Sequence, residues 1–150
     1  MNGRFKYRAW HKPTKRMFDV WDFTPEYVFE DDEVNGVGVT PTNPAMMEDC
    51  ILLQSTGLRD KNGQLIFEGD IINAYVEYIN SVTECKNALV MYSDSNASLD
   101  ICTADGDSHE FSLFEPSEEG IEVVGNIFEQ PELVSAILKR WWDQQYKEEK

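Results

Sequence analysis

The sequence predicts a mainly β fold (α+β): a small, partly open barrel or sandwich of hairpins, followed by a C-terminal amphipathic helix. Short apolar segments alternate with turn signals about every 8–12 residues, a spacing typical of such β architectures. Only the C-terminal end changes to the periodicity of a helix. With 150 residues, of which 41% are hydrophobic, the chain fits a single domain with its own core.

Residues 1–21 are predicted to form an N-terminal hairpin. Apolar and polar side chains alternate from Arg4 to Trp10, which indicates a half-buried strand. Pro13 lies in a basic turn, and residues 17–21 read as the second strand. The two strands are therefore expected to pair.

Residues 22–48 form an irregular, acidic stretch. Three prolines interrupt it, at Pro25, Pro41 and Pro44, and they exclude a long helix or a central strand. Any strands or turns within this stretch are expected to be short.

Residues 49–128 are predicted to be the β body. Within it, Asn62-Gly63 predicts a hairpin with a type I′ turn, a turn that needs positive φ at both central residues. Gly125 interrupts the last strand of the body and predicts a bulge or a close backbone approach.

A tight bend is predicted at Glu68-Gly69-Asp70, just before the next apolar strand. Gly69 permits the bend, and the Asp70 carboxylate can accept hydrogen bonds from backbone amides. We therefore assign structural turn roles to Asn62, Gly63, Gly69 and Asp70.

Residues 130–147 are predicted to form the helix, with Pro131 and Glu132 in its first turn. Two adjacent rows of apolar side chains follow at helical spacing: Leu133, Ile137 and Trp141, and Val134, Leu138 and Trp142. This face either covers the β core or leaves aromatic side chains to anchor a protein interface. The candidate interface residues are Trp141, Trp142 and Leu138.

The charge of the chain is strongly negative and uneven. The net charge is −15, with 13 basic and 28 acidic residues. Residues 1–20 carry +5 and the remaining 130 residues carry −20. A field of this sign argues against direct binding of nucleic acid or anionic membrane. The basic segment is either a solvated hairpin face or a partner for the acidic remainder, within one chain or between subunits.

The three cysteines, Cys50, Cys85 and Cys102, lack metal-type spacing and are expected to be buried free thiols in a reducing compartment. The basic N-terminus has no signal-peptide pattern, and no apolar run approaches the ~18 residues that cross a bilayer. These features predict a protein of a reducing cytoplasm without a membrane partner.

Three blocks of sequence carry a family resemblance and occur in order along the chain. They are Lys6-Tyr-Arg-Ala-Trp10 with Met17, Thr56-Gly-Leu-Arg-Asp-Lys-Asn-Gly63 with Phe67-Glu-Gly-Asp-Ile71, and Val124-Gly-Asn-Ile-Phe-Glu-Gln-Pro-Glu-Leu133. In these blocks the chain resembles the YopX family, small proteins encoded by bacteriophages and prophages. The resemblance implies a mostly β, intracellular protein with no established biochemical activity, so no catalytic or binding residue is carried over.

The motifs assign no catalytic, cofactor-binding or metal-binding residue. Asp94-x-Asn96-x-Ser98 begins like a calcium loop, but Leu99 and Asp105 occupy positions that require Gly and Glu. His11 and His109 have no second ligand at metal spacing. Whether the protein is an enzyme stays open, although the absence of a catalytic constellation argues against it.

The sequence therefore favours a non-enzymatic protein-interaction module that forms a homo-oligomer or binds a host or phage protein, and it calls for no cofactor. One alternative is an acidic mimic of nucleic acid that inhibits a host DNA-binding protein. A second alternative is a cation-dependent enzyme that uses carboxylates such as Glu68 and Asp70.

Overall fold

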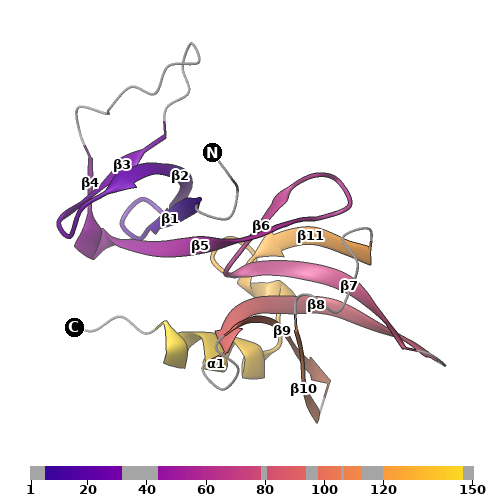
Figure 1. Cartoon of the computed structure of the whole chain (residues 1–150). Coiled ribbons are helices and arrows are strands. Elements are labelled where there is room, and N and C mark those ends of the chain that lie inside the picture. The colour runs from indigo at the N-terminus through magenta and orange to yellow at the C-terminus, as the bar shows by residue number, and fades with distance from the viewer. Residues whose placement is uncertain are drawn as a thin grey trace. The chain divides into compact units, whose positions relative to one another are not determined.

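A computed structural model describes residues 6–31, 44–78, 81–93, 98–105, 107–112 and 120–146 (Figure 1). The chain divides into two compact units, Met1–Gly57 and Leu58–Lys150. The predicted mainly β fold with one C-terminal helix is confirmed, since strands make up 56% of the structure. The described strands form two antiparallel sheets and close no barrel.

The first unit is built on an antiparallel sheet in the order β4-β3-β2-β1-β5. Its elements are β1 (Tyr7–His11), β2 (Arg16–Phe23), β3 (Tyr27–Glu30), β4 (Ala45–Met46), a 3-10 turn (Met47–Asp49) and β5 (Cys50–Arg59), which continues into the second unit. The N-terminal hairpin consists of β1 and β2. Since β3 has four residues and β4 has two, the described part of the 22–48 stretch holds short strands, as predicted.

One face of this sheet carries the core of the first unit. Ala9 on β1 lies opposite Phe18 on β2, and both are buried together with Val28 on β3. Cys50 and Leu52 on β5 pack against these three residues. Burial of a side chain such as that of Phe18 contributes about 1.5–3 kcal/mol. The alternation of the N-terminal strands thus places one apolar face inward.

The second unit contains a sheet in the order β10-β9-β8-β7-β11, again antiparallel. Its strands are β6 (Leu65–Phe67), which lies next to β5, and β7 (Asp70–Tyr78), β8 (Ser81–Ser93), β9 (Ser98–Asp105), β10 (Asp107–Ser112) and β11 (Ile121–Asn126). A buried cluster from β6, β7, β8 and β11 forms its core: Ile66, Ile72, Ala74, Cys85, Ala88, Val90 and Ile121.

Gly125 marks an irregularity in β11, as predicted. The register between β11 and β7 shifts between Val123 and Gly125. A Cβ atom at position 125 would lie 2.7 Å from Oε1 of Gln130. That same oxygen accepts a hydrogen bond of 3.0 Å from the Asn126 amide. Glycine is therefore needed because the Gln130 side chain folds back onto the strand.

The hairpin at Asn62-Gly63 forms between β5 and β6, but its turn is not of type I′. Gly63 has φ +83°, whereas Asn62 does not have a positive φ. The Gly63 amide donates to the Asp60 carbonyl at 3.0 Å, and the Asp60 amide donates to the Gln64 carbonyl at 2.8 Å. The reason lies in Asp60, whose Oδ1 accepts from the amides of Asn62 and Gln64, both at 2.9 Å. This carboxylate supports a longer turn that needs a left-handed residue only at Gly63.

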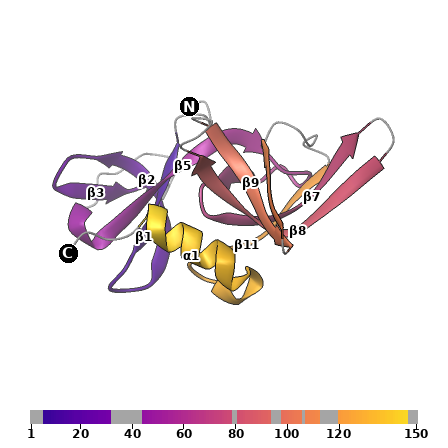
Figure 2. The same cartoon turned by 90° about the horizontal axis from the view of Figure 1, so that it is seen from below.

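The C-terminal helix is shorter than the predicted 130–147 range. Pro131–Leu133 forms a 3-10 turn, and α1 spans Ala136–Gln145. Ser135 caps the helix, because its hydroxyl accepts a hydrogen bond of 3.3 Å from the Leu138 amide. The predicted first turn therefore belongs to a separate element that ends before the cap. Within the second unit, α1 lies beside β9 (Figures 1 and 2).

The described cysteines are free thiols. Cys85 is buried in the core of the second unit, and Cys50 is half-buried in the first unit. Burial, with the nearby Asp49 charge, raises the pKa of Cys50. The side chain of Cys102 lies outside the described residues.

Candidate functional site

The bend at Glu68-Gly69-Asp70 gives its two carboxylates different partners within the second unit. Asp70 is buried, and its Oδ2 accepts a hydrogen bond of 2.8 Å from the Phe67 amide. Glu68 Oε2 accepts a hydrogen bond of 2.5 Å from the Tyr146 hydroxyl. Gly69 lies between them with φ +86°. One carboxylate therefore holds the bend, and the other holds the end of α1.

The candidate interface residues on α1 do not share one environment. Leu138 and Trp142 are buried, whereas Trp141 is half-buried. The Trp142 ring stacks on Tyr146 at 3.8 Å and meets the edge of Phe128 at 5.5 Å between centroids. Trp142 thus packs inside the second unit, and the exposed large apolar residue of the helix is Ile137, at 44%.

A hollow of about 280 Å³ opens on the core face of the first unit. It is lined by His11, Thr14, Arg16, Phe18, Val28, Glu30, Pro44 and Ala45. His11 ends β1 and Arg16 begins β2, opposite each other in register. Glu30 ends β3 and lies opposite Val20. The β1–β2 hairpin and the return of β3 therefore bring polar side chains to the rim of an apolar floor.

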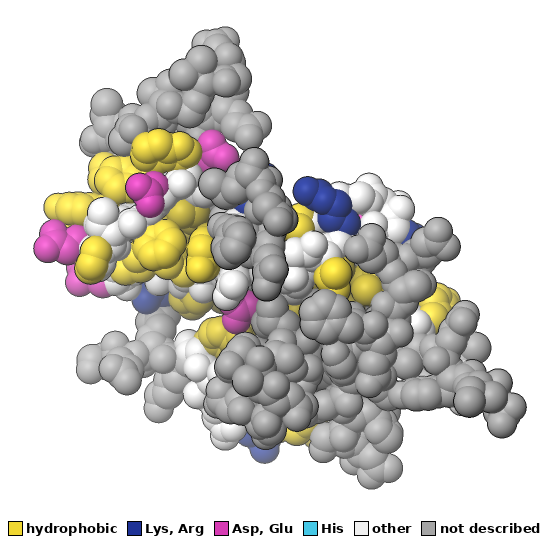
Figure 3. All heavy atoms as spheres, in the orientation of Figure 1, with side chains coloured by type: hydrophobic (Ala, Val, Ile, Leu, Met, Phe, Trp, Pro, Cys, Tyr) yellow, Lys and Arg dark blue, Asp and Glu magenta, His cyan; other side chains and the backbone are white. Residues whose placement is uncertain are grey.

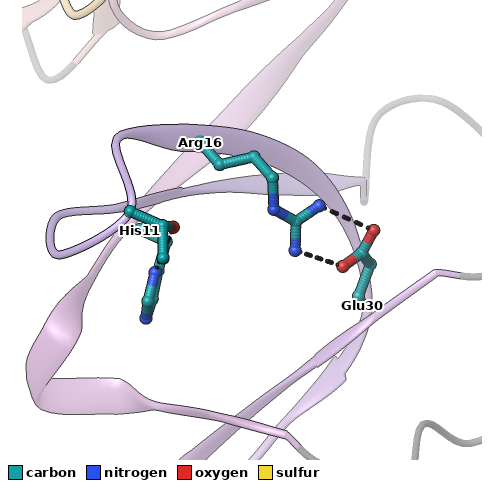
Figure 4. Close-up of polar contacts among 4 residues, drawn as sticks. His11, Arg16 and Glu30 are labelled. Carbon is teal, nitrogen blue, oxygen red and sulfur yellow. Dashed lines mark hydrogen bonds and ion pairs between the residues drawn. The ribbon is translucent and has the colours of Figure 1, made fainter.

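The Arg16–Glu30 ion pair spans this hollow. Val20 lies four positions after Arg16 on β2, a distance of about 13 Å along the strand. The arginine side chain reaches across Phe18, with its guanidinium 5.0 Å from the ring centroid. It then donates from Nη2 to Glu30 Oε1 at 2.6 Å and from Nη1 to Oε2 at 3.0 Å (Figure 4). The pair therefore lies over the aromatic floor.

Each partner of this pair holds the other in its charged form. The hydrogen bonds from Arg16 lower the pKa of Glu30, and partial burial opposes that change. The hydrogen bonds to Glu30 raise the pKa of Arg16 in the same way. Both side chains are partly exposed, so the pair adds little to stability. The position of the pair over Phe18 is therefore more informative about the hollow than its contribution to stability.

His11 takes a different position at the rim. Its Nδ1 lies 2.6 Å from Oγ1 of Thr14, in hydrogen-bonding contact within the turn. In Figure 4 the imidazole points away from the Arg16–Glu30 pair. The histidine thus has a hydroxyl neighbour rather than a carboxylate.

A second feature of the first unit is a group of exposed apolar side chains on β2, β3 and β4, called here the apolar surface: Trp21, Phe23, Tyr27 and Met46. Their exposed fractions lie between 37% and 44%. Tyr27 lies opposite Met46 on β4, so these two side chains share one face of the sheet. Phe23 lies opposite Val28 on the core face, where it meets the Tyr7 ring edge-on at 5.3 Å. Figure 3 shows hydrophobic side chains gathered where Figure 1 places β2–β4, with acidic side chains among them.

The charges around this apolar surface are acidic. Asp22, Glu26 and Glu48 are exposed and lie within two residues of its members along the chain. Two cations of the first unit, Lys12 and Lys15, lie instead in the β1–β2 turn. One of the cations of the basic N-terminal segment, Arg16, finds its acidic partner within the chain.

The remaining candidates from the sequence do not form a metal-binding site among the described residues. Among the described residues, no group of three His, Cys, Asp or Glu side chains could hold a metal ion. The 94–97 part of the calcium-like motif and the side chain of His109 lie outside the described residues. No helix in the described part of the chain is long and apolar enough to cross a membrane.

The sequence motifs indicated neither the hollow with its Arg16–Glu30 ion pair nor the apolar surface of the first unit. Arg16 precedes the predicted second strand and Glu30 lies in the irregular, acidic stretch, so no local pattern indicated that the two residues pair. Trp21 ends the predicted N-terminal hairpin, and Phe23 and Tyr27 lie in the Pro-containing stretch, where no alternation assigns them a face. The density of aromatic residues in an otherwise acidic segment is the signal that could have marked this surface.

Comparisons with known proteins agree with this fold. A family model described as YopX protein matches residues 6–135. The crystal structure of protein EF1440 from Enterococcus faecalis is similar, with TM-score 0.51 and 24% identity over 87% of this chain and 97% of that one. The crystal structure of protein yopX from Bacillus subtilis has TM-score 0.53 and 18% identity, over 90% and 100% of the two chains. No curated protein matches the chain.

Proposed function

Because this chain belongs to the YopX family, we propose a function from its surface: a non-enzymatic protein-interaction module that assembles with further copies of itself. We also infer a bacterial cytoplasmic setting, which the resemblance to bacteriophage and prophage proteins implies. The observation that carries the proposal is the exposed, facing pair of Tyr27 and Met46 within the apolar surface of the first unit.

The apolar surface has the composition of a protein interface. Large aromatic side chains and methionine are enriched at such interfaces, because they bury much area for little loss of conformational freedom. Trp21, Phe23, Tyr27 and Met46 supply four of these side chains on three adjacent strands. Removing them from water in an assembly would supply the main driving force for association.

Charge complementarity favours a second copy of the chain as the partner. The apolar surface is bordered by Asp22, Glu26 and Glu48, whereas the β1–β2 turn presents Lys12 and Lys15. In the proposed contact, the basic turn of one subunit lies at the acidic border of the next subunit. Such ion pairs steer association and fix its orientation more than they add affinity.

Light scattering on the purified protein over a range of concentrations tests this proposal. The wild-type protein should have a mass above that of one chain. The double variant Tyr27→Ser/Met46→Ser removes a facing pair from the apolar surface and should weaken association by about tenfold or more. High salt should weaken wild-type association moderately, since the border charges are exposed.

Tyr75→Ser provides the matched control, because Tyr75 is 49% exposed on β7 of the second unit. This variant should assemble like the wild type. Ile137→Ser tests the helix in the same assay. A single-chain mass for the wild type at every concentration, or an unchanged mass for Tyr27→Ser/Met46→Ser, would contradict the proposal.

Neither alternative function gains support from the described residues. The carboxylates of Glu68 and Asp70, on which the enzyme hypothesis depends, accept hydrogen bonds within the chain. The acidic side chains bordering the apolar surface are separated by aromatic ones, unlike the regular charge of a nucleic-acid backbone.

A further inference from the structure

We propose that the hollow over Phe18 is a binding site for a small organic carboxylate, with the anionic head at Arg16 and an apolar body on the floor. The hollow lies wholly within the first unit and on the core face of its sheet. Small-molecule sites in proteins have volumes of about 300–1,000 Å³, so about 280 Å³ suits a small occupant.

The floor of the hollow supplies the apolar contact. Phe18 and Val28 belong to the buried core of the first unit, and Ala45 packs against them. Pro44 adds a further apolar wall. These side chains are held by the sheet, so the floor does not have to form when a ligand binds. A flat or branched hydrocarbon body of a few carbon atoms would fit such a surface.

Arg16 supplies the anion-binding group. A guanidinium has five N–H donors, and Glu30 accepts two of them, one from each terminal nitrogen. The described residues accept no hydrogen bond from the other three, which include Nε–H. A carboxylate can take a second side of the same fork, because the planar guanidinium binds such groups in pairs of parallel hydrogen bonds.

The rim of the hollow adds a polar group and positive charge, both of which suit an anionic ligand. Thr14 contributes a hydroxyl, and Lys12 and Lys15 in the adjacent turn add positive charge. Glu30 is the opposing group, because its charge repels an anion and occupies part of Arg16. This opposition distinguishes a binding site from a purely structural ion pair, since removal of each partner should change carboxylate binding in opposite directions.

Titration with benzoate, followed by amide NMR shifts, tests the proposal. Wild-type protein should show saturable shifts near Phe18 at millimolar benzoate. The neutral analogue benzamide should bind more weakly because it lacks the negative charge that Arg16 would bind. Inorganic phosphate should bind more weakly because it lacks the apolar body that would contact the floor. Glu30→Gln keeps the shape of the side chain and removes its charge, so benzoate should bind roughly two- to fivefold more tightly. Arg16→Gln should abolish saturable binding.

Arg59→Gln is the control, since Arg59 is an exposed arginine of the second unit whose Nη1 donates to the Gly63 carbonyl. It should leave benzoate binding unchanged. If Arg16→Gln fails to fold, the Glu30→Gln variant still tests the proposal, because it should bind benzoate more tightly than the wild type. Equal weakening in Glu30→Gln and Arg16→Gln, or no saturable shift in wild type, would overturn the proposal. Light scattering of the same samples reports self-association separately, so failure of one proposal is distinguishable from failure of the other.

Discussion

The Asp60 carboxylate accepts a hydrogen bond of 3.0 Å from the Val123 amide, 63 residues further along the chain. With its other oxygen it accepts from two amides of its own turn. Asp60 is 4% exposed. A residue at the tip of a hairpin is thus a buried link between that hairpin and β11, within the second unit.

Replacing Asp60 should therefore destabilise the second unit. Asp60→Ala leaves backbone amides without an acceptor in a buried place, and the expected loss is about 2–3 kcal/mol in the free energy of unfolding. Urea unfolding measured by circular dichroism gives this value. Lys61→Ala changes the neighbouring exposed residue and should cost less than about 0.5 kcal/mol. Equal losses in the two variants would argue against the link.

The same residue predicts a dependence on acid. Burial alone raises the pKa of Asp60, but hydrogen bonds from Val123, Gln64 and Asn62, with the Lys61 charge, outweigh it and lower the pKa below 3.8. A lowered pKa in the folded state means that the carboxylate stabilises the fold fully above 3.8. That contribution is lost as the pH falls through the lower value. The difference in Tm between wild type and Asp60→Asn should therefore shrink below about pH 4.

Gly69 and Gly63 offer a matched test of close packing. Both have positive φ, at +86° and +83°. A Cβ at Gly69 would lie 3.0 Å from Cη2 of Trp142, whereas one at Gly63 would meet nothing within 4 Å. Gly63→Ala should cost about 1–2 kcal/mol from backbone strain. Gly69→Ala should cost about 1–3 kcal/mol more from overpacking.

A double variant identifies the source of that extra loss. Trp142→Phe removes the ring atoms that the new methyl group would meet. Gly69→Ala/Trp142→Phe should therefore lose less stability than the sum of its two single variants. Strictly additive losses in urea unfolding would show that the tryptophan is not the obstacle.

The adjacent tryptophans of α1 should differ sharply in their effect on stability. Trp142 is 4% exposed and packed between Phe128 and Tyr146, so Trp142→Ala should cost about 3–5 kcal/mol. Trp141 is half-buried, and Trp141→Ala should cost distinctly less. The two substitutions remove the same side chain from neighbouring positions, so each is the control for the other. Similar unfolding midpoints would be incompatible with the burial of Trp142.

Local patterns in the sequence predicted which strands and hairpins form. They were less successful for the residue at which the helix begins and for hydrogen bonds between residues far apart in the chain. Alternation near Ala9 and the Asn62-Gly63 signal depend on neighbours along the chain, and both led to observed hairpins. The start of α1 differs from the prediction because Pro131 and Ser135 are both suitable starting residues, and only the Ser135 side chain caps the element that follows it. The roles of Asp60 and Glu30 depend on partners 63 and 14 residues away, which periodicity does not reveal.

The two described thiols can report separately on local unfolding of the two units, because each unit contains one of them. Cys50 lies in the first unit and Cys85 in the second. Alkylating reagents attack the thiolate, so a raised pKa slows the reaction of Cys50 in the folded state, as burial does for Cys85. Labelling would then follow transient exposure of each site. Peptide mapping of a single time course would separate the two positions and measure the opening rate of each unit in the same sample.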